Sequence, residues 1–243
     1  MGVRRDLNTI VSIKSMDSVV KTAHPTILLI AQASLLSVAV ANAVVATRTP
    51  VASESSISNL LSLLICLIAY VHYREISKAR SWSKVDKLRH SDWLLTTPLL
   101  VLEFALFLKL NPFKNRHSAV KAGVSAALAV LMVIFGYLAR IKRNTDSNLY
   151  MIMYLCGCAC FVAICILLLA KNDKHKHKHK QEKVHVVQSQ KRRHALVTAF
   201  LCLWGVYGLV FWLNQQQRSM VYTLLDALSK SGFGLVIALL GLL

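Results

Sequence analysis

The chain has 243 residues, of which 55% are hydrophobic, and it carries a formal net charge of +18. Apolar stretches of membrane-spanning length occupy nearly the whole chain, which excludes a separate soluble domain of substantial size. The basic residues lie mainly between these stretches, so anionic lipid headgroups are expected as partners rather than nucleic acid. All six cysteines fall inside apolar stretches, which argues against a disulfide framework, and their spacing predicts no metal site.

Seven apolar stretches follow one another along the chain. Each has the ~20 residues needed to cross about 30 Å of hydrocarbon at 1.5 Å per residue. They are too long for the strands of a membrane barrel and do not alternate as such strands do. The predicted fold is therefore an all-α membrane protein, a seven-transmembrane-helix bundle within residues 23–243. The predicted spans are 24–46, 57–79, 90–110, 118–141, 147–170, 194–214 and 218–243.

Three segments depart from this simple pattern. Residues 1–22 have no apolar core of the signal-peptide kind and are predicted to form an N-terminal leader. The Lys- and His-rich segment 171–193 is predicted to be a solvated basic loop between helices five and six, in preference to a weak metal or lipid site. The second span begins with polar residues, including Ser55, Ser58 and Asn59, as expected of a helix that lines an aqueous path or continues beyond the membrane.

Ionisable side chains inside membrane spans are costly in lipid and usually functional. The third span contains Asp92 and Glu103, and the seventh contains Asp226 and Lys230. Asp226 and Lys230 are four residues apart, so they share one helical face. Asp92 and Glu103 also share a face and are separated by roughly 16 Å along the helix axis. A salt bridge that merely joins two helices would explain Lys230 with Asp92 or Asp226, but it would not explain Glu103.

The third span has a column of polar residues on one face. Arg89 lies one turn before Asp92, and Thr96 lies one turn after it, whereas an apolar gap precedes Glu103. An acid in apolar surroundings is most stable in its neutral, protonated form. The pattern therefore predicts a proton held in reserve at Glu103, and it suits stepwise proton transfer better than an open pore.

The segment RHSDWLLTTPLL at 89–100 resembles the third-helix signature of the microbial (type 1) rhodopsins. DALSK at 226–230, followed by GFG at 232–234, is similar to their retinal-attachment helix. Three further segments resemble the second, fourth and sixth helices, the second being closest to proteorhodopsins: AYVHY at 69–73, LMVIFGYLA at 131–139 and WGVYGLVFW at 204–212. The motifs occur in the family's order, and the resemblance covers all but the leader and the loops.

The resemblance implies a role for each buried charge. Lys230 would form the retinal Schiff base, Asp92 would be its counterion and primary proton acceptor, and Asp226 would be the second counterion. Glu103 occupies the cytoplasmic proton-donor position, and Thr96 would hydrogen-bond Asp92. Asp92, Thr96 and Glu103 together are similar to the Asp-Thr-Glu triplet of proteorhodopsin-like pumps.

Four other residues gain expected roles from the same resemblance. Arg89 would be the gating arginine on the proton-release side, and His72 would pair with the proton acceptor. Tyr73 would hydrogen-bond the second counterion and belong to the cofactor site. Ser62 lies three turns from Tyr73 and could bond Glu103.

The resemblance also implies a lining for the retinal pocket and a green absorption, because leucine stands at position 100. The expected lining residues are Trp93, Thr97, Leu100, Met132, Gly136, Trp204, Tyr207 and Phe211, with Tyr154, Gly157 and Phe161 as further members. There are departures from the family: Gly208 replaces a proline, Phe211 and Tyr154 replace tryptophans, and segment 213–220 contains no acid.

A light-driven outward proton pump is the favoured function, and the protein is not expected to be an enzyme. The alternatives are a light-gated cation channel, as in some viral and algal relatives, and a sensory photoreceptor. A channel needs a continuous polar path, and sensors commonly lack the donor. The expected partners are membrane lipids, protons or other cations, and further copies of the chain in a homo-oligomer. The resemblance places the N-terminus outside the cell and the 171–193 loop in the cytoplasm.

Overall fold

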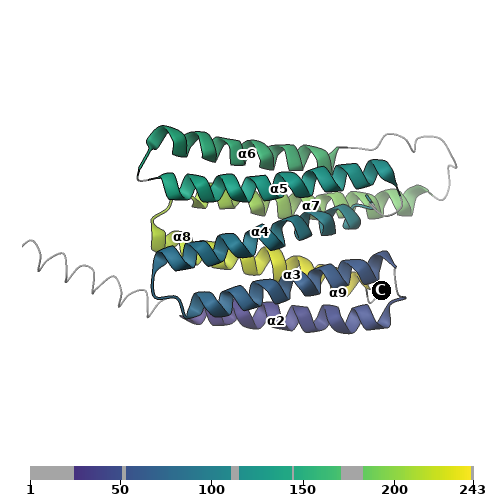
Figure 1. Cartoon of the computed structure of the whole chain (residues 1–243). Helices are drawn as coiled ribbons and strands as arrows, with labels where there is room; N and C mark the ends of the chain where they lie inside the picture. The colour runs from purple at the N-terminus through teal and green to yellow at the C-terminus, as the bar shows by residue number, and fades with distance from the viewer. Residues whose placement is uncertain (1–24, 51–52, 111–114, 144, 171–182, 242–243) are drawn as a thin grey trace, which may run out of the picture.

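The computed structural model describes residues 25–50, 53–110, 115–143, 145–170 and 183–241. Over these residues the chain forms helices that lie side by side (Figure 1). The helices are α2 (Pro25–Arg48), α3 (Glu54–Ser77), α4 (Trp82–Phe107), α5 (Arg116–Lys142), α6 (Ser147–Leu169), α7 (Lys183–Val210) and α8 (Gln215–Asp226). A π-helical segment, η2 (Ala227–Gly232), joins α8 to α9 (Phe233–Gly241), so these last three elements make one continuous span.

Local sequence signals set where several helices begin. Ser53, Ser81, Asn115, Asp146 and Asn214 each precede a helix, and each side chain accepts a hydrogen bond from a main-chain N–H in the first turn. Such caps satisfy N–H groups that have no partner within the helix. The short connections that they terminate make successive helices antiparallel neighbours, as in other helix bundles.

The described helices close into a bundle around two large buried clusters and two smaller ones. Neighbours in sequence pack against each other from α2 to α8, and α2 also packs against α8, η2 and α9, which closes the ring. One of the large clusters joins α4 to α7 and α9 around Phe104 and Phe233, and the other joins α2 and α3 around Leu35 and Tyr73. Many large apolar side chains face outward, as expected for a surface in contact with lipid rather than water.

The predicted fold class is confirmed: the described chain is all helical, and its spans correspond to the seven predicted ones. Six of them are apolar enough throughout to cross a membrane by composition, and α4 is more polar because it carries the buried charges. Most predicted boundaries differ from the observed ones by a few residues, and the predicted starts of two helices were wrong by a larger margin. α4 begins at Trp82 rather than at 90, and α7 begins at Lys183 rather than at 194, so residues 183–193 are helical and not loop. Hydropathy follows the hydrocarbon boundary, whereas the helices continue past it. The predicted leader and the repeated Lys-His sequence at 174–180 lie outside the described residues.

Candidate functional site

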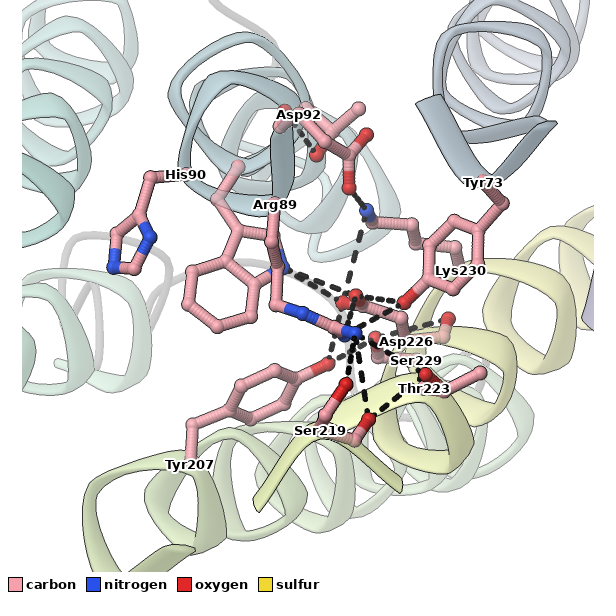
Figure 2. A network of polar contacts seen from close by, with 12 residues as sticks. Tyr73, Arg89, His90, Asp92, Tyr207, Ser219, Thr223, Asp226, Ser229 and Lys230 are labelled. Atoms are coloured by element: carbon pink, nitrogen blue, oxygen red, sulfur yellow. Dashed lines mark hydrogen bonds and ion pairs between the residues drawn. The ribbon is translucent and has the colours of Figure 1, made fainter. Parts of the chain in front are cut away.

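Two carboxylates surround a buried lysine at the centre of the bundle (Figure 2). Lys230, in η2, donates a hydrogen bond from Nζ to Oδ2 of Asp92 on α4. Its Nζ also lies 3.7 Å from Oδ1 of Asp226, which is the last residue of α8. All three side chains are at most 2% exposed. Charges so deeply buried are stable only when paired, so the three groups form one mutually dependent unit.

The two carboxylates differ sharply in their surroundings. Asp226 accepts hydrogen bonds from Tyr73 Oη at 2.5 Å, from Trp93 Nε1 at 3.0 Å and from Tyr207 Oη at 2.8 Å. In contrast, Oδ1 of Asp92 is buried and has no hydrogen-bond partner within the described part of the chain. The oxygens of Asp226 are therefore occupied by donors, whereas Asp92 has a free oxygen that can accept a proton.

Arg89 completes the network on the side of Lys230 away from Glu103. Its guanidinium is 1% exposed and lies 3.6 Å from Oδ2 of Asp226. It donates to Tyr73 Oη at 3.0 Å, to both oxygens of Ser219 at 3.3 Å, and to Thr223 Oγ1 at 3.2 Å. Figure 2 shows these side chains converging on the guanidinium. The arginine thus links α4 with α3 and α8 through charge-assisted bonds.

Lys230 sits on a backbone irregularity that the sequence pattern did not predict. Ala227–Gly232 is π-helical, within an otherwise α-helical span. Such turns interrupt the regular hydrogen-bond ladder and are frequent at functional sites. Next to it, Cys66 Sγ lies 3.9 Å from the main-chain oxygen of Lys230. The π-helical segment thus contains the residue that is expected to carry the cofactor.

A cavity of about 350 Å³ leads from Lys230 between α4, α5, α6 and α7. Its wall is mostly apolar and aromatic, with Lys230 and Asp226 at one end. Eight of the predicted pocket residues line it: Trp93, Thr97, Leu100, Met132, Gly136, Trp204, Tyr207 and Phe211. The further members Tyr154, Gly157 and Phe161 line it too. Tyr73 is not among the lining residues; its ring packs with α2 and α3, and its hydroxyl bonds Asp226.

Several lining residues were missed by the sequence reasoning. They are His90, Val133, Cys158, Gly205, Gly208, Leu209, Tyr222 and Ser229. Most lie one position or one turn away from a predicted member on the same helix, so helical spacing could have found them. Tyr222 is different, because it reaches the pocket from α8 by packing edge-on against Trp93.

Glu103 lies deeper along α4, away from Arg89. It is 1% exposed, among apolar residues that include Phe104 and Ala105, and Ser62 of α3 donates a hydrogen bond to its Oε1. The predicted Ser62–Glu103 contact is therefore present. Because Asp92 and Glu103 are both buried on the inner side of α4, their shared face points into the bundle as expected.

Comparison with known proteins decides the family. The family model described as "Bacteriorhodopsin-like protein" matches residues 23–242. The chain belongs to the bacteriorhodopsin-like family. Retinal is the chromophore of this family, so the expected cofactor is confirmed, and the protein is an integral, multi-pass membrane protein.

Solved rhodopsin structures have the same fold. Xanthorhodopsin, described as a light-driven ion pump with dual chromophore, is 20% identical with a TM-score of 0.72, and the match covers 93% of each chain. The rhodopsin of Exiguobacterium sibiricum is 22% identical with a TM-score of 0.68, covering 89% of this chain and 94% of that one. A proton-pumping rhodopsin from the marine alga Acetabularia acetabulum is 19% identical with a TM-score of 0.68, covering 88% and 92%. No match was found among curated proteins.

The cavity of this bacteriorhodopsin-like protein fits a retinal. A long apolar cofactor that ends in a reactive carbonyl needs an apolar slot that ends at an amine. The slot here ends at Lys230 Nζ, and the aromatic rings of Trp93 and Trp204 line its sides. The residues that would hold the cofactor are therefore Lys230 at the attachment point and the apolar wall along its length.

Two contacts that were predicted for the Asp92 carboxylate, those with Thr96 and His72, are made to main-chain oxygens in the structure. Thr96 does bond Asp92, but its hydroxyl donates to the main-chain oxygen at 2.9 Å rather than to the carboxylate. His72 is half-buried, and its Nδ1 lies 2.9 Å from the main-chain oxygen of Ile68 in its own helix. The expected pairing of His72 with the proton acceptor stays a prediction.

Proposed function

We propose that this rhodopsin is a light-driven outward proton pump. The observation that carries the proposal is the order of buried groups along α4 relative to Lys230. The partly unsatisfied acid Asp92 contacts Lys230 directly, and Arg89 lies beyond it toward one end of the bundle. The isolated acid Glu103 lies toward the other end. A proton that leaves Lys230 Nζ for Asp92 and is replaced by one from Glu103 moves in one direction along the bundle.

In the dark, the paired carboxylates hold a proton on Lys230 Nζ. One opposite charge at about 4 Å is worth roughly 4 kcal/mol at an effective dielectric of 20. Bound retinal supplies light absorption and photoisomerisation. Once the N–H turns away from Asp92, the attraction that kept this acid ionised falls, and its free Oδ1 can take the proton. Asp226 keeps its place in the network, because three donors and Arg89 continue to hold its oxygens.

The second half of the cycle restores the proton from the other side. Glu103 is surrounded by apolar residues, so its neutral form is favoured and a proton is available. Ser62 fixes the carboxyl group by hydrogen bonding to Oε1. Transfer from Glu103 to Nζ leaves a buried carboxylate, which then draws a proton from the nearer aqueous phase. Arg89 lies on the side of Lys230 away from Glu103. Its positive charge favours release of the proton from Asp92 toward that end of the bundle.

The direction called outward depends on the orientation in the membrane. We propose that the N-terminus is outside and the 171–193 segment is cytoplasmic, as the family resemblance implies. The antiparallel order of α2 to α4 then places Arg89 on the outer side and Glu103 on the cytoplasmic side. The homo-oligomer implied by the same resemblance belongs to this proposal, and light scattering of the detergent-solubilised protein would test it.

Photocurrent recording under voltage clamp tests the pump against the channel. A pump should give a current that keeps its outward sign at every accessible voltage. The channel alternative has one observation in its favour, because Ser58, Asn59 and Ser62 form a buried polar row on α3. A current that reverses with the cation gradient would establish the channel and sink the pump. A protein with a photocycle but no current would match a sensory receptor.

A further inference from the structure

A buried arginine with an unpartnered nitrogen lies at the end of the bundle where α4 and α8 begin and α5 ends (Figure 1). Arg218, near the start of α8, is 3% exposed. Its Nη1 donates a long hydrogen bond, of 3.4 Å, to the main-chain oxygen of Leu213. Its Nη2 is buried and has no hydrogen-bond partner within the described part of the chain. A buried charge without a partner is costly, so this guanidinium lacks a negatively charged neighbour.

The surroundings of Arg218 are rich in positive charge. Arg140, in the last turn of α5, and Arg143, just beyond it, both repel its guanidinium. Asp86 of α4 attracts it but is already engaged, because its Oδ2 accepts a hydrogen bond from Arg140 Nε at 3.0 Å. Arg143 donates to a neutral group, the main-chain oxygen of Phe211, at 3.1 Å. Among the described residues, three guanidinium groups thus share one carboxylate.

The start of α8 adds to this excess of positive charge. The N–H groups of the first turn give the N-terminus of a helix a partial positive charge, which favours an anion and disfavours a cation. Asn214 caps α8 with a neutral amide, and segment 213–220 contains no acid. Burial, the neighbouring arginines and the helix end therefore all oppose the charge of Arg218. An anion beside Nη2 would offset all three effects.

The burial of these groups indicates that the anion is small. The side chains of Arg140 and Asp86 are 18% and 20% exposed, and Arg218 is almost completely covered. A lipid phosphate, with its glycerol and acyl chains, would need an open approach to the arginine. A monovalent inorganic ion needs only small movements of side chains to enter. Guanidinium groups and helix N-termini are both favourable partners for such an ion.

We propose that Arg218, Arg140 and the start of α8 form a binding site for a small inorganic anion such as chloride. The site is separate from the charged centre at Lys230, and it goes beyond proton transport, because the anion compensates the arginines and transfers no proton. Bound beside Arg218, the anion joins the end of α5 to α8, and the pair between Arg140 and Asp86 extends this connection to α4. A ligand that binds the folded state in this way stabilises it.

Thermal unfolding of the full-length, retinal-loaded protein in detergent tests the site. Chloride is titrated against gluconate, a bulky anion, at constant ionic strength, so that general screening stays fixed. The melting temperature of the unmodified protein should rise by about 3–6 °C when chloride reaches ten times its Kd. Arg218→Gln should remove this dependence. In gluconate alone the variant should be at least as stable as the unmodified protein, because it no longer buries an unpaired charge.

Arg80→Gln is the matched control, because Arg80 is exposed and lies at the same end of the bundle, between α3 and α4. It should keep the full chloride effect. The visible absorption band, recorded in the same samples, should not depend on chloride, since an anion beside Lys230 would shift it.

Three results would overturn the proposal. The first is a chloride effect that persists in Arg218→Gln, and the second is one accompanied by a shift of the visible band. The third is the absence of any chloride effect in the unmodified protein. If Asp6→Asn or Asp17→Asn then lowers the melting temperature in gluconate, the partner of Arg218 is an acid of the chain's own N-terminal segment and not a bound anion. The outcome is independent of the pump, because no step of it requires light.

Discussion

Asp226 lies one helical turn before Lys230, and its Oδ1 is 3.7 Å from the lysine Nζ. The contact is longer than the hydrogen bond from Lys230 to Asp92, even though Asp226 belongs to the same continuous span. The reason lies in the other partners of Asp226, since Tyr73, Trp93 and Tyr207 all hold its oxygens. The two acids are consequently unequal, one anchored and one free to change its protonation.

This inequality predicts different outcomes for two matched variants. Asp226→Asn should destabilise the protein by about 3–5 kcal/mol, because it leaves Arg89 buried without a carboxylate partner. Asp92→Asn should cost less stability and should abolish the photocurrent, because the proton acceptor is gone. Thermal unfolding and voltage clamp on both variants check this. A larger loss of stability for Asp92→Asn would contradict the assignment of Asp226 as the anchored acid.

Lys230→Ala should remove the visible absorption band of the protein reconstituted with retinal, because the cavity then has no amine at its end. The exposed Lys78→Ala is the matched control and should keep the full band. Both variants should elute as folded protein in size-exclusion chromatography. A folded Lys230→Ala protein that still shows the full band would place the attachment elsewhere.

Glu103→Gln should slow recovery of the photocycle by about 10²-fold or more, the usual contribution of a positioned acid. The amide preserves size and a hydrogen bond with Ser62 but has no proton to give. Ser62→Ala should slow the same phase by less, because it removes only the group that orients the carboxyl. Flash photolysis measures both. Normal recovery in Glu103→Gln would remove Glu103 from the donor role.

Leu100→Gln should shift the absorption maximum from green toward blue. Leu100 is 2% exposed and lines the cavity, so a polar amide at this position would alter the electrostatic environment along the cofactor. Leu99, a neighbour on the same helix outside the cavity lining, offers a control substitution, Leu99→Gln, that should leave the maximum in place. An unshifted spectrum in Leu100→Gln would contradict the pocket assignment of this residue.

The seven spans and the charged centre could be predicted because each leaves a strong one-dimensional signal. Apolar length gives the spans, and an acid or lysine within such a stretch is rare enough to be informative. The helical repeat also places Asp92 and Glu103 on one face. The extensions of α4 and α7 beyond the hydrocarbon could not be predicted in this way, because residues in the headgroup region are polar although helical.

Three features of the structure depend on local geometry or on packing in three dimensions and could not be predicted from the sequence pattern. The π-helical turn at Ala227–Gly232 has no residue signature, since it depends on how the span packs against its neighbours. The Thr96 hydroxyl bonds a main-chain oxygen because, within a helix, a threonine hydroxyl can reach the carbonyl oxygen four residues before it. The small cavity lined by Glu54, Ser58 and Arg193 is formed by separate elements, so no single segment could indicate it.

Gly208 lies in the last turn of α7, where the family resemblance leads one to expect a proline. The final turn of α7 is tightened, because the N–H of Trp212 bonds Leu209 rather than Gly208. The hydroxyl of Tyr154 on α6 donates to the Gly208 oxygen at 3.2 Å and accepts from Trp212 Nε1 at 3.3 Å. Tyr154 therefore satisfies a carbonyl group that the helix leaves without its usual partner.

Tyr154→Phe should lower the free energy of unfolding by about 0.5–1.5 kcal/mol, the usual net value of one hydrogen bond. Tyr150→Phe is the matched control, because Tyr150 packs on the same Phe211 ring, at 6.0 Å between centroids, mainly through its own ring. Chemical denaturation of the two variants in one detergent measures the difference. If both lose the same stability, the effect comes from the aromatic cluster in general. A loss confined to Tyr154→Phe would show that a bond between α6 and α7 takes over part of the restraint that a proline would impose on this turn.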